Sequence, residues 1–244
     1  MPVKSAERTI RILEAFASAC EPLALSELAR RISIPVSACH GLVRTLEARG
    51  YLYALGPRKG YYPTLRWLEK ARAIAAHDPL LERVTPLLEG LAASTGETVV
   101  LGKRLALMVV YLNVIESRHS IRYSARIGDL KPLYSSSIGK ALLGAMPADV
   151  RDATLHRIKL ARITPTTITR RSALEKDLAA ALARGWAMTR GENVPDVHAI
   201  AAPIRIAGET YAIAVAGPAQ RIDANLQAHV RQLIKTCQAM EDST

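Results

Sequence analysis

The chain has 244 residues, of which 49% are hydrophobic and 23% are charged, and its mean hydropathy is +0.08. This composition is ordinary for a packed soluble protein and excludes a mainly disordered chain, and no apolar run approaches the roughly 18 residues of a membrane-spanning helix. Thirty-three basic residues against 22 acidic ones give a net charge of +11, which favours a polyanionic partner, either nucleic acid or an acidic membrane surface.

Three scattered cysteines, Cys20, Cys39 and Cys237, neither frame a disulfide scaffold nor show the spacing of a zinc site. Adjacent helix residues such as Cys39 and His40 diverge by about 100°, and they seldom bind one ion together. The first residues form an amphipathic pattern with interspersed charges, unlike a signal peptide. We therefore expect a protein of the reducing cytoplasm with no cofactor and no bound metal.

Basic charge is densest in residues 1–76, which carry 12 basic and 6 acidic side chains and leave a net charge of +5 to the rest of the chain. At the start of this segment, apolar spacing predicts an amphipathic helix that is capped by Ser5. The predicted inner face of this helix consists of Ala6, Ile10, Leu13 and Ala17, with Ile12 and Phe16 beside it.

The next elements predict a helix-turn-helix. A short helix at residues 25–32, with Ser26 as its cap, is followed by a tight turn, because Pro35 fixes its own φ and pushes the residue before it out of the helical region. A third helix is predicted over about residues 36–49. Its buried side consists of Leu42, Val43 and Leu46. The second helix of a helix-turn-helix enters the major groove of DNA.

Two short β-prone runs, residues 51–53 and 60–62, flank a turn whose tip carries Arg58 and Lys59. Basic pairs in turns usually serve only to solvate the turn, but after a helix-turn-helix in a basic segment we expect these two to contact phosphates. Three helices and a hairpin predict a winged helix-turn-helix DNA-binding domain over residues 1–63.

The remaining elements predict a linker helix and a second domain. Residues 64–78 hold an amphipathic helix, over 64–76, that is broken before Pro79. In residues 79–244, helices are predicted at 80–94, 136–146, 148–159, 172–184 and 223–240. Strands are predicted at 97–103, 107–115, 121–125, 186–189, 199–206 and 211–216. Because the strand pairs lack crossover helices, we expect an α/β (α+β) domain with a largely antiparallel sheet.

Several of these segments share the order and the sequence of one family. They are VKSAERTIRILEAF, LSELARRISIP and LVRTLEARGYL in the first half, and IGKALL at 138–143, IAAPI at 200–204 and Gly217-Pro218 in the second. Over nearly its whole length the chain resembles the IclR-type transcriptional regulators. The resemblance implies a GAF-like effector-binding domain at 79–244, homodimers or tetramers, and ligand-responsive control of catabolic genes. It implies double-stranded operator DNA and a small-molecule effector as partners, and from the sequence as a whole we expect no membrane association and no enzyme activity.

The segment that corresponds to the family's recognition helix departs from the family pattern. Val36, Ala38 and Gly41 stand where lysine, threonine and arginine are usual, so we expect a different operator preference and a stronger dependence on phosphate contacts and salt. Within a helix, Gly41 costs about 1 kcal/mol relative to alanine. The alternative interpretation is that the missing side chain allows a close approach to the backbone. The residues that remain to bind DNA are Ser26, Ser37, His40, Arg44, Thr45, Arg58 and Lys59.

The resemblance places the effector against the backbone amides of Ser137 and Ile138, at the start of the helix of the IGKALL motif. Amides at a helix N-terminus attract anions, which makes a carboxylate effector physically reasonable. The serine run at 135–137 is interpreted as the cap and approach of that helix.

The side chains expected around this site also differ from the family pattern. The acid expected near Thr189 is missing and Arg190 stands beside it, while Ala199, Ala214 and Ala216 replace a cysteine and two serines. Methyl groups at these positions enlarge and dry the site. We therefore hypothesise an effector with an apolar or aromatic body and one carboxylate, which Arg190 also contacts. The alternative is that the alanines only pack a core.

Two other functions stay open at this point. Ser137 and Lys140 fit the S-x-x-K motif of serine-dependent hydrolases, in which the lysine assists attack by the serine, but the partner motifs S-D-N and K-T-G are missing. A non-sensing, architectural nucleic-acid-binding protein would use charge alone and would not need a second domain of about 165 residues. A change of DNA affinity with a small acid distinguishes a sensor from an architectural protein.

Overall fold

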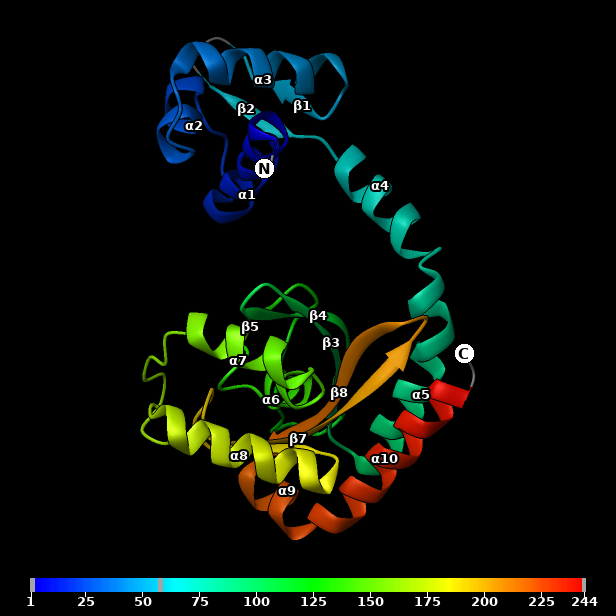
Figure 1. Ribbon diagram of the computed structural model, residues 1–244. Coiled ribbons are helices and arrows are strands. Elements are labelled where there is room, and N and C mark those ends of the chain that lie inside the picture. The colour runs from blue at the N-terminus through cyan, green and yellow to red at the C-terminus, as the bar shows by residue number, and fades with distance from the viewer. Residues whose placement is uncertain (1–2, 57–58, 243–244) are drawn as a thin grey trace. The chain divides into compact units, whose positions relative to one another are not determined.

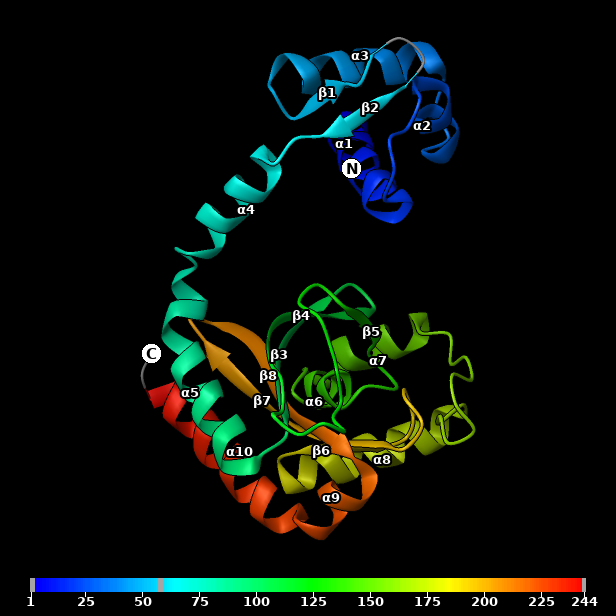
Figure 2. The ribbon, with the colours of Figure 1, turned by 180° about the vertical axis from the view of Figure 1, so that it is seen from behind.

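The structure is a computed structural model that describes residues 3–56 and 59–242, and the chain divides into two compact units, Met1–Asp78 and Pro79–Thr244 (Figure 1, Figure 2). Each unit is built around hydrophobic residues of its own. Within the described residues, no helix is both long and apolar enough to cross a membrane.

Helices and a hairpin form the first unit. The bounds of its elements are α1 Lys4–Ala19, α2 Leu25–Arg31, α3 Val36–Ala48, β1 Leu52–Ala54, β2 Tyr61–Pro63 and α4 Arg66–Ala75. Strands β1 and β2 are antiparallel, and Leu23, which precedes α2, forms a bridge with Tyr61 of β2. This bridge ties the hairpin to the helices, and the predicted winged helix-turn-helix fold is confirmed.

Helix α1 faces the core of the first unit with a different side from the predicted one. Ile12 and Phe16 are buried there, whereas Ala6 and Ala17 are exposed and the side chain of Ile10 is 59% exposed. Apolar residues occur on both sides of this helix, and so its spacing alone does not fix which side packs. The core that selects the buried side consists of Leu23, Leu28, Ala29, Ile32, Cys39, Val43, Leu46 and Leu52.

The predicted caps of the first two helices are wrong. Helix α1 begins at Lys4 and α2 begins at Leu25, so Ser5 and Ser26 lie inside the first turn, and neither helix start has a side-chain cap hydrogen bond. Both starts are exposed, where water can satisfy the free amides of a first turn. Helix α3 starts directly after Pro35, as the turn chemistry predicts.

A six-stranded antiparallel sheet forms the centre of the described second unit, with the strand order β5-β4-β3-β8-β7-β6. Its strands are β3 Thr98–Leu105, β4 Met108–Ile115, β5 Leu130–Pro132, β6 Ala187–Arg190, β7 Val197–Ile206 and β8 Glu209–Pro218. The helices are α5 Pro79–Thr95, α6 Ser137–Gly144, α7 Ala148–Arg157, α8 Arg171–Arg184, α9 Ala219–Ala224 and α10 Leu226–Asp242. The predicted antiparallel α+β fold is confirmed, and the predicted last helix corresponds to α10, which the short helix α9 precedes.

Alternate residues of this sheet face two separate cores, because successive side chains of a strand point to opposite faces. Val99 and Leu101 of β3 pack in the core that α5 and α10 cover, whereas Val100 packs in the core that α6 and α8 cover (Figure 1). On the α6 side, the buried residues of β7 and β8 include Ala199, Ala201, Ala212, Ala214 and Ala216. Three of these small side chains, Ala199, Ala214 and Ala216, also line a cavity beside the start of α6.

One predicted strand of the second unit is wrong. Residues 121–125 do not form a strand, and the edge strand beside β4 is β5 instead. The carbonyl groups of Ile121 and Tyr123 accept hydrogen bonds from the side chains of Arg221 and Thr98. Side chains therefore satisfy backbone groups that a neighbouring strand would otherwise pair.

Candidate functional site

Helix α3 presents a polar face to solvent. Ser37, His40 and Arg44 are exposed and follow one another at intervals of three and four residues, which places them on one side of the helix. The opposite side is buried in the core of the first unit through Cys39, Val43 and Leu46. The predicted recognition helix therefore offers hydroxyl, imidazole and guanidinium groups that do not pack in the core.

The other predicted DNA-binding residues lie on α2, α3 and the hairpin turn. Ser26 is exposed on α2, and Lys59 is exposed in the turn between β1 and β2, while Arg58 lies outside the described residues. Thr45 is exposed on α3, and its hydroxyl donates to the carbonyl of Gly41 at 2.9 Å. The oxygen lone pairs of Thr45 therefore remain for contact with a donor.

Two basic side chains of α2 are tied to one carboxylate. Arg30 and Arg31 bind Glu27 with nitrogen–oxygen distances of 2.6 and 2.7 Å. The hydrogen bond from Arg30, followed by the one from Arg31, lowers the pKa of Glu27, so that this carboxylate stays ionised. Part of the positive charge of α2 is therefore neutralised within the helix itself.

A cavity lies between the alanine-rich face of the sheet and the start of α6. Ala199 of β7 stands opposite Thr189 of β6 and Ala216 of β8, and Ala214 stands opposite Val100 of β3. Because residues two apart in a strand share a face, these side chains form one floor. The lining is completed by Tyr111, Tyr123, Ser136, Ser137, Asn193, Val194 and Val197. We call this space the alanine-floored cavity.

The alanine-floored cavity is narrow in this structure. Its volume is about 30 Å³, which is room for about one water molecule. A larger occupant therefore has to displace part of the lining. Asn193 and Val194 come from the segment between β6 and β7, and this part of the lining can move without breaking the sheet or the hydrogen bonds that hold the segment of Tyr123.

The start of α6 supplies polar groups to the cavity. The hydroxyl of Ser136 caps the helix by accepting a hydrogen bond from the amide of Gly139 at 3.1 Å. The amides of Ser137 and Ile138 belong to the first turn, which has no helical carbonyl for them, and they lie at the positive end of the helix dipole. The side chain of Ile138 is buried, so this residue can serve a ligand only through its backbone. This end of the cavity attracts anions.

Arg190 does not line the alanine-floored cavity, contrary to the prediction. It follows Thr189 in β6, and neighbouring residues of a strand point to opposite faces. The side chain of Thr189 is therefore buried at the cavity, whereas Arg190 is exposed. Arg190 therefore supplies no positive charge to the cavity lining, and the amides at the start of α6 remain the predicted anion site.

A buried lysine lies on α6, one turn beyond the serines of the cavity. The ammonium of Lys140 is 2.7 Å from Oε1 of Glu192 and 2.7 Å from Oδ2 of Asp177 on α8. Burial raises the pKa of Glu192, and the positive charge of Lys140 opposes this shift. The ion pair ties Glu192, which precedes Asn193 and Val194 in the segment after β6, to α6. Sequence reasoning missed both carboxylates, although a lysine inside the apolar IGKALL run signals a buried charge that needs partners.

The contacts of Lys140 also bear on the alternative that Ser137 and Lys140 form the catalytic pair of a serine-dependent hydrolase. A lysine that assists a serine nucleophile has to interact with the serine hydroxyl. The ammonium of Lys140 is instead held between Glu192 and Asp177. Ser137 and Lys140 therefore do not form a catalytic pair in this structure.

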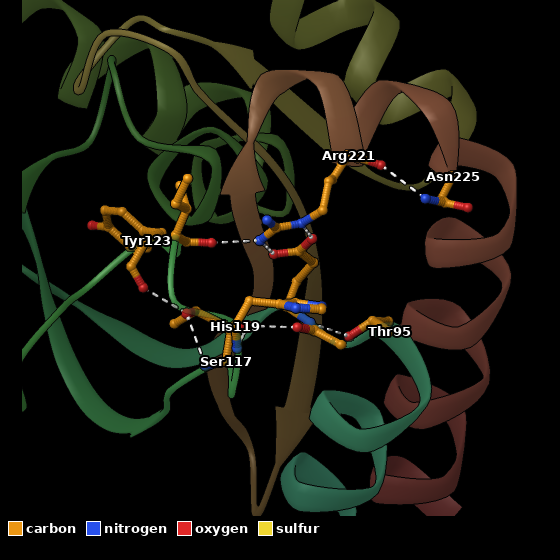
Figure 3. Close-up of polar contacts among 10 residues, drawn as sticks. Thr95, Ser117, His119, Tyr123, Arg221 and Asn225 are labelled. Carbon is orange, nitrogen blue, oxygen red and sulfur yellow. Dashed lines mark hydrogen bonds and ion pairs between the residues drawn. The ribbon is translucent and has the colours of Figure 1, made fainter.

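A second buried carboxylate holds the segment that carries Tyr123 (Figure 3). Glu97 is 2% exposed and accepts two hydrogen bonds from the guanidinium of Arg221 in α9, at 2.5 and 2.8 Å. The same guanidinium donates to the carbonyl of Ile121 at 3.0 Å, and Thr98 donates to the carbonyl of Tyr123 at 2.6 Å. These side chains hold the segment against the sheet and so set the position of the Tyr123 ring in the cavity lining.

Two further residues complete this network. Ser117 donates to the carbonyl of Gly96 at 2.6 Å, which attaches the beginning of the same segment to the end of α5 (Figure 3). Gly217 has to be a glycine, because a Cβ atom there would overlap the carboxylate of Glu97. The Gly-Pro motif that the sequence singles out thus leaves room for the buried carboxylate.

Comparison with known families gives matches for both units. The model of the bacterial transcriptional regulator IclR C-terminal domain matches residues 72–241, and the IclR helix-turn-helix domain matches residues 5–56. The HTH-type transcriptional regulator BhcR of Paracoccus denitrificans is 35% identical over 230 residues, which cover 93% of this chain and 82% of that protein. The transcriptional repressor IclR of Escherichia coli K12 is 28% identical over 228 residues, which cover 90% of this chain and 82% of the repressor.

A solved structure agrees with these matches. An IclR homologue from Microbacterium hydrocarbonoxydans, crystallised in complex with 4-hydroxybenzoate, superposes with a TM-score of 0.80 at 25% sequence identity. The match covers 98% of each chain. Both units therefore have counterparts in one and the same kind of protein.

Proposed function

The chain belongs to the IclR family of bacterial transcriptional regulators, and from this premise we propose that it controls catabolic genes in response to a small carboxylate with an apolar or aromatic body. As a member of this family it is a DNA-binding regulator and not an enzyme. The observation that carries the proposal is the alanine-floored cavity, whose methyl groups line the same space as the start of α6.

The proposed effector uses two chemically different parts. Its carboxylate binds the amides of Ser137 and Ile138, where the helix dipole favours negative charge. Its apolar body lies on Ala199, Ala214 and Ala216, at positions where hydroxyl or thiol groups would favour a smaller and more polar acid. The 4-hydroxybenzoate bound by the Microbacterium homologue is an aromatic carboxylate, which supports this class of effector.

Binding of such an effector requires a wider cavity. The volume of about 30 Å³ is too small for an aromatic ring, so the effector binds a form in which the segment of Asn193 and Val194 has moved. A ligand that prefers the wider form shifts the population toward it. In the proposed mechanism the wider form changes the spacing of the recognition helices in a pair of protomers, and with it the affinity for the operator.

We propose that α3 and the hairpin turn bind double-stranded operator DNA in the cytoplasm. The exposed face of α3 supports this role, with Arg44 as its positive charge. The proposed assembly is a homodimer or tetramer that α4 helps to form. Helix α4 buries no residue in this chain, and the apolar side chains of Leu65, Leu68 and Ile74 on or beside it are exposed.

Titration of the full chain with matched acids tests the proposal. We expect calorimetry to show tighter binding of benzoate and 4-hydroxybenzoate than of glyoxylate, and the aromatic acids to raise the melting temperature and to change the affinity for an operator selected from genomic fragments. Tight binding of glyoxylate alone, or no effect of any acid on DNA affinity, contradicts the proposal.

Substitutions on the cavity floor sharpen the same test. We expect Ala214→Ser and Ala216→Ser to weaken binding of the aromatic acids and to strengthen binding of glyoxylate, because each adds a polar group to the lining. Ala201→Ser is the matched control. Ala201 lies in β7 and is buried on the same face of the sheet as Ala214 and Ala216, but it does not line the cavity. This variant is expected to lose stability without a change in the preference between acids.

A further inference from the structure

Two tyrosines of the alanine-floored cavity are not used by the carboxylate site proposed above. Tyr111 of β4 and Tyr123 of the 121–125 segment are 6% and 9% exposed, and their hydroxyl oxygens lie 3.4 Å apart. A phenol can donate one hydrogen bond and accept others. One proton is enough for the bond between the two hydroxyls, so the second proton remains available to a ligand.

The tyrosine hydroxyls and the polar side chain of Thr189 lie at opposite ends of the cavity floor. Tyr111 comes from β4, whereas Thr189 comes from β6, and strands β3, β8 and β7 lie between them. The intervening floor consists of Val100, Ala214, Ala216 and Ala199. An apolar body that lies on this floor can therefore carry a substituent to the tyrosine pair.

Side chains that bind the backbone carbonyls of its segment, and not pairing with a strand, hold Tyr123 in place. Arg221 binds the carbonyl of Ile121, and Thr98 binds the carbonyl of Tyr123 itself (Figure 3). Glu97 in turn fixes the guanidinium of Arg221 through two hydrogen bonds. These hydrogen bonds to the backbone set the position of the Tyr123 ring. In that position the Tyr123 hydroxyl lies next to the hydroxyl of Tyr111.

The tyrosine pair is suited to a neutral group. Burial is the main cause that raises the pKa of Tyr111 above its usual value, and the nearby Tyr123 and Asp129 add to the shift. The Tyr111 phenol therefore stays protonated and uncharged at physiological pH.

We propose that the hydroxyl pair of Tyr111 and Tyr123 is a second recognition point for the effector, and that it selects acids with a hydroxyl group on their apolar body over the same acids without it. This inference rests on the proposed binding of an apolar carboxylate in the same cavity. Since the two tyrosines hydrogen-bond each other when no ligand is present, the acid without a hydroxyl leaves no group wholly unpaired. We therefore expect a preference of about tenfold, the size that one or two net hydrogen bonds give.

Calorimetric titration of the full chain with matched pairs of acids tests the proposal. The pairs are benzoate with 3-hydroxybenzoate and with 4-hydroxybenzoate, and hexanoate with 6-hydroxyhexanoate. We expect the wild-type protein to bind at least one hydroxylated acid about tenfold more tightly than its partner. The variant that carries both Tyr111→Phe and Tyr123→Phe should abolish this preference, measured as the ratio of the two affinities, whereas either substitution alone leaves one hydroxyl that the hydroxylated acid can still bind.

Tyr134→Phe is the matched control. Tyr134 is also buried, but its hydroxyl donates to the carbonyl of Ala161 at 2.8 Å and does not line the cavity. This variant should keep the preference for the hydroxylated acid. Melting curves with and without ligand show that each phenylalanine variant is folded and still binds.

The outcomes separate this inference from the proposed function. Equal affinity for both members of every pair, or a preference that survives in the double variant, overturns the role of the tyrosine pair and leaves the carboxylate proposal intact. Stronger binding of a dicarboxylate such as terephthalate than of 4-hydroxybenzoate also overturns it. If no acid of any pair binds, the proposed function itself fails, and the inference fails with it.

Discussion

The exposed face of α3 and the alanine-floored cavity are assembled in different ways. Ser37, His40 and Arg44 share one side of one helix, because their spacing matches its period. The cavity takes residues from five strands, from the start of α6 and from two segments outside the strands, and buried ion pairs hold parts of these in place. The proposed DNA-binding face therefore depends on local structure, and the cavity depends on long-range contacts.

This difference implies that substitutions can damage one site and spare the other. A change in a buried charge of the second unit should alter effector binding and stability together. A change on the exposed face of α3 should alter DNA binding with little effect on stability, because no core contact is lost. The following variants test this separation.

The largest effect is expected for Lys140→Met. Methionine keeps most of the buried volume but leaves the carboxylates of Glu192 and Asp177 without their counter-ion, which lowers the free energy of unfolding by about 3–5 kcal/mol. Urea unfolding at neutral pH measures this loss. Lys103→Met is the control, because Lys103 pairs with Glu209 at the surface and its loss should cost about 1 kcal/mol or less. Equal losses in the two variants would show that the buried pair does not stabilise the unit.

A smaller effect is expected for Arg221→Met. The substitution leaves the buried carboxylate of Glu97 without its charged donor and should lower the free energy of unfolding by about 2 kcal/mol. Loss of the bond to Ile121 should also speed amide hydrogen exchange in the 117–125 segment and weaken effector binding. Arg122→Met is the control, since Arg122 pairs with Glu116 in an exposed part of the same region. Unchanged exchange in Arg221→Met would contradict the role of Arg221 in holding this segment.

The same contrast explains how much the sequence could predict. The helix-turn-helix followed from turn chemistry and spacing, and the family resemblance identified Thr189, Ala199, Ala214 and Ala216, which line one cavity in the structure. Tyr123 was not found, because its segment has no strand pairing and takes its position from side chains that lie far away in the sequence.

Two errors in α1 and β6 have related causes. The buried side of α1 was predicted wrongly, because apolar residues lie on both of its sides and only the tertiary core selects Ile12 and Phe16. Arg190 was expected in the site because it neighbours Thr189 in sequence, whereas neighbours in a strand point to opposite faces. In both cases the residue type was read correctly, and the direction of the side chain was decided by packing.

On the DNA-binding side, Arg44→Ala should change affinity and leave stability nearly unchanged. Loss of one guanidinium contact is expected to weaken operator binding by about 1.5 kcal/mol, roughly tenfold, and to lower the slope of log affinity against log salt by about 1 if the contact is to a phosphate. Fluorescence anisotropy at several salt concentrations measures both. Lys176→Ala removes the same charge from an exposed position on α8 and should leave both nearly unchanged. An equal loss in the two variants would mean that net charge, and not the face of α3, sets the affinity.

The smallest expected effect, on Gly41→Ala, decides whether the glycine of α3 serves stability or contact. A Cβ atom at this position meets nothing within 4 Å, so alanine should raise the free energy of unfolding by about 1 kcal/mol through helix propensity alone. Gly90→Ala in α5 is the matched control, because its Cβ also meets nothing within 4 Å, and it should give a similar gain without any effect on DNA. If α3 approaches the DNA backbone closely at Gly41, its variant alone should bind the operator more weakly, since the added methyl group occupies the contact. Equal operator affinity in both variants would leave Gly41 as a cost in stability that DNA binding does not require.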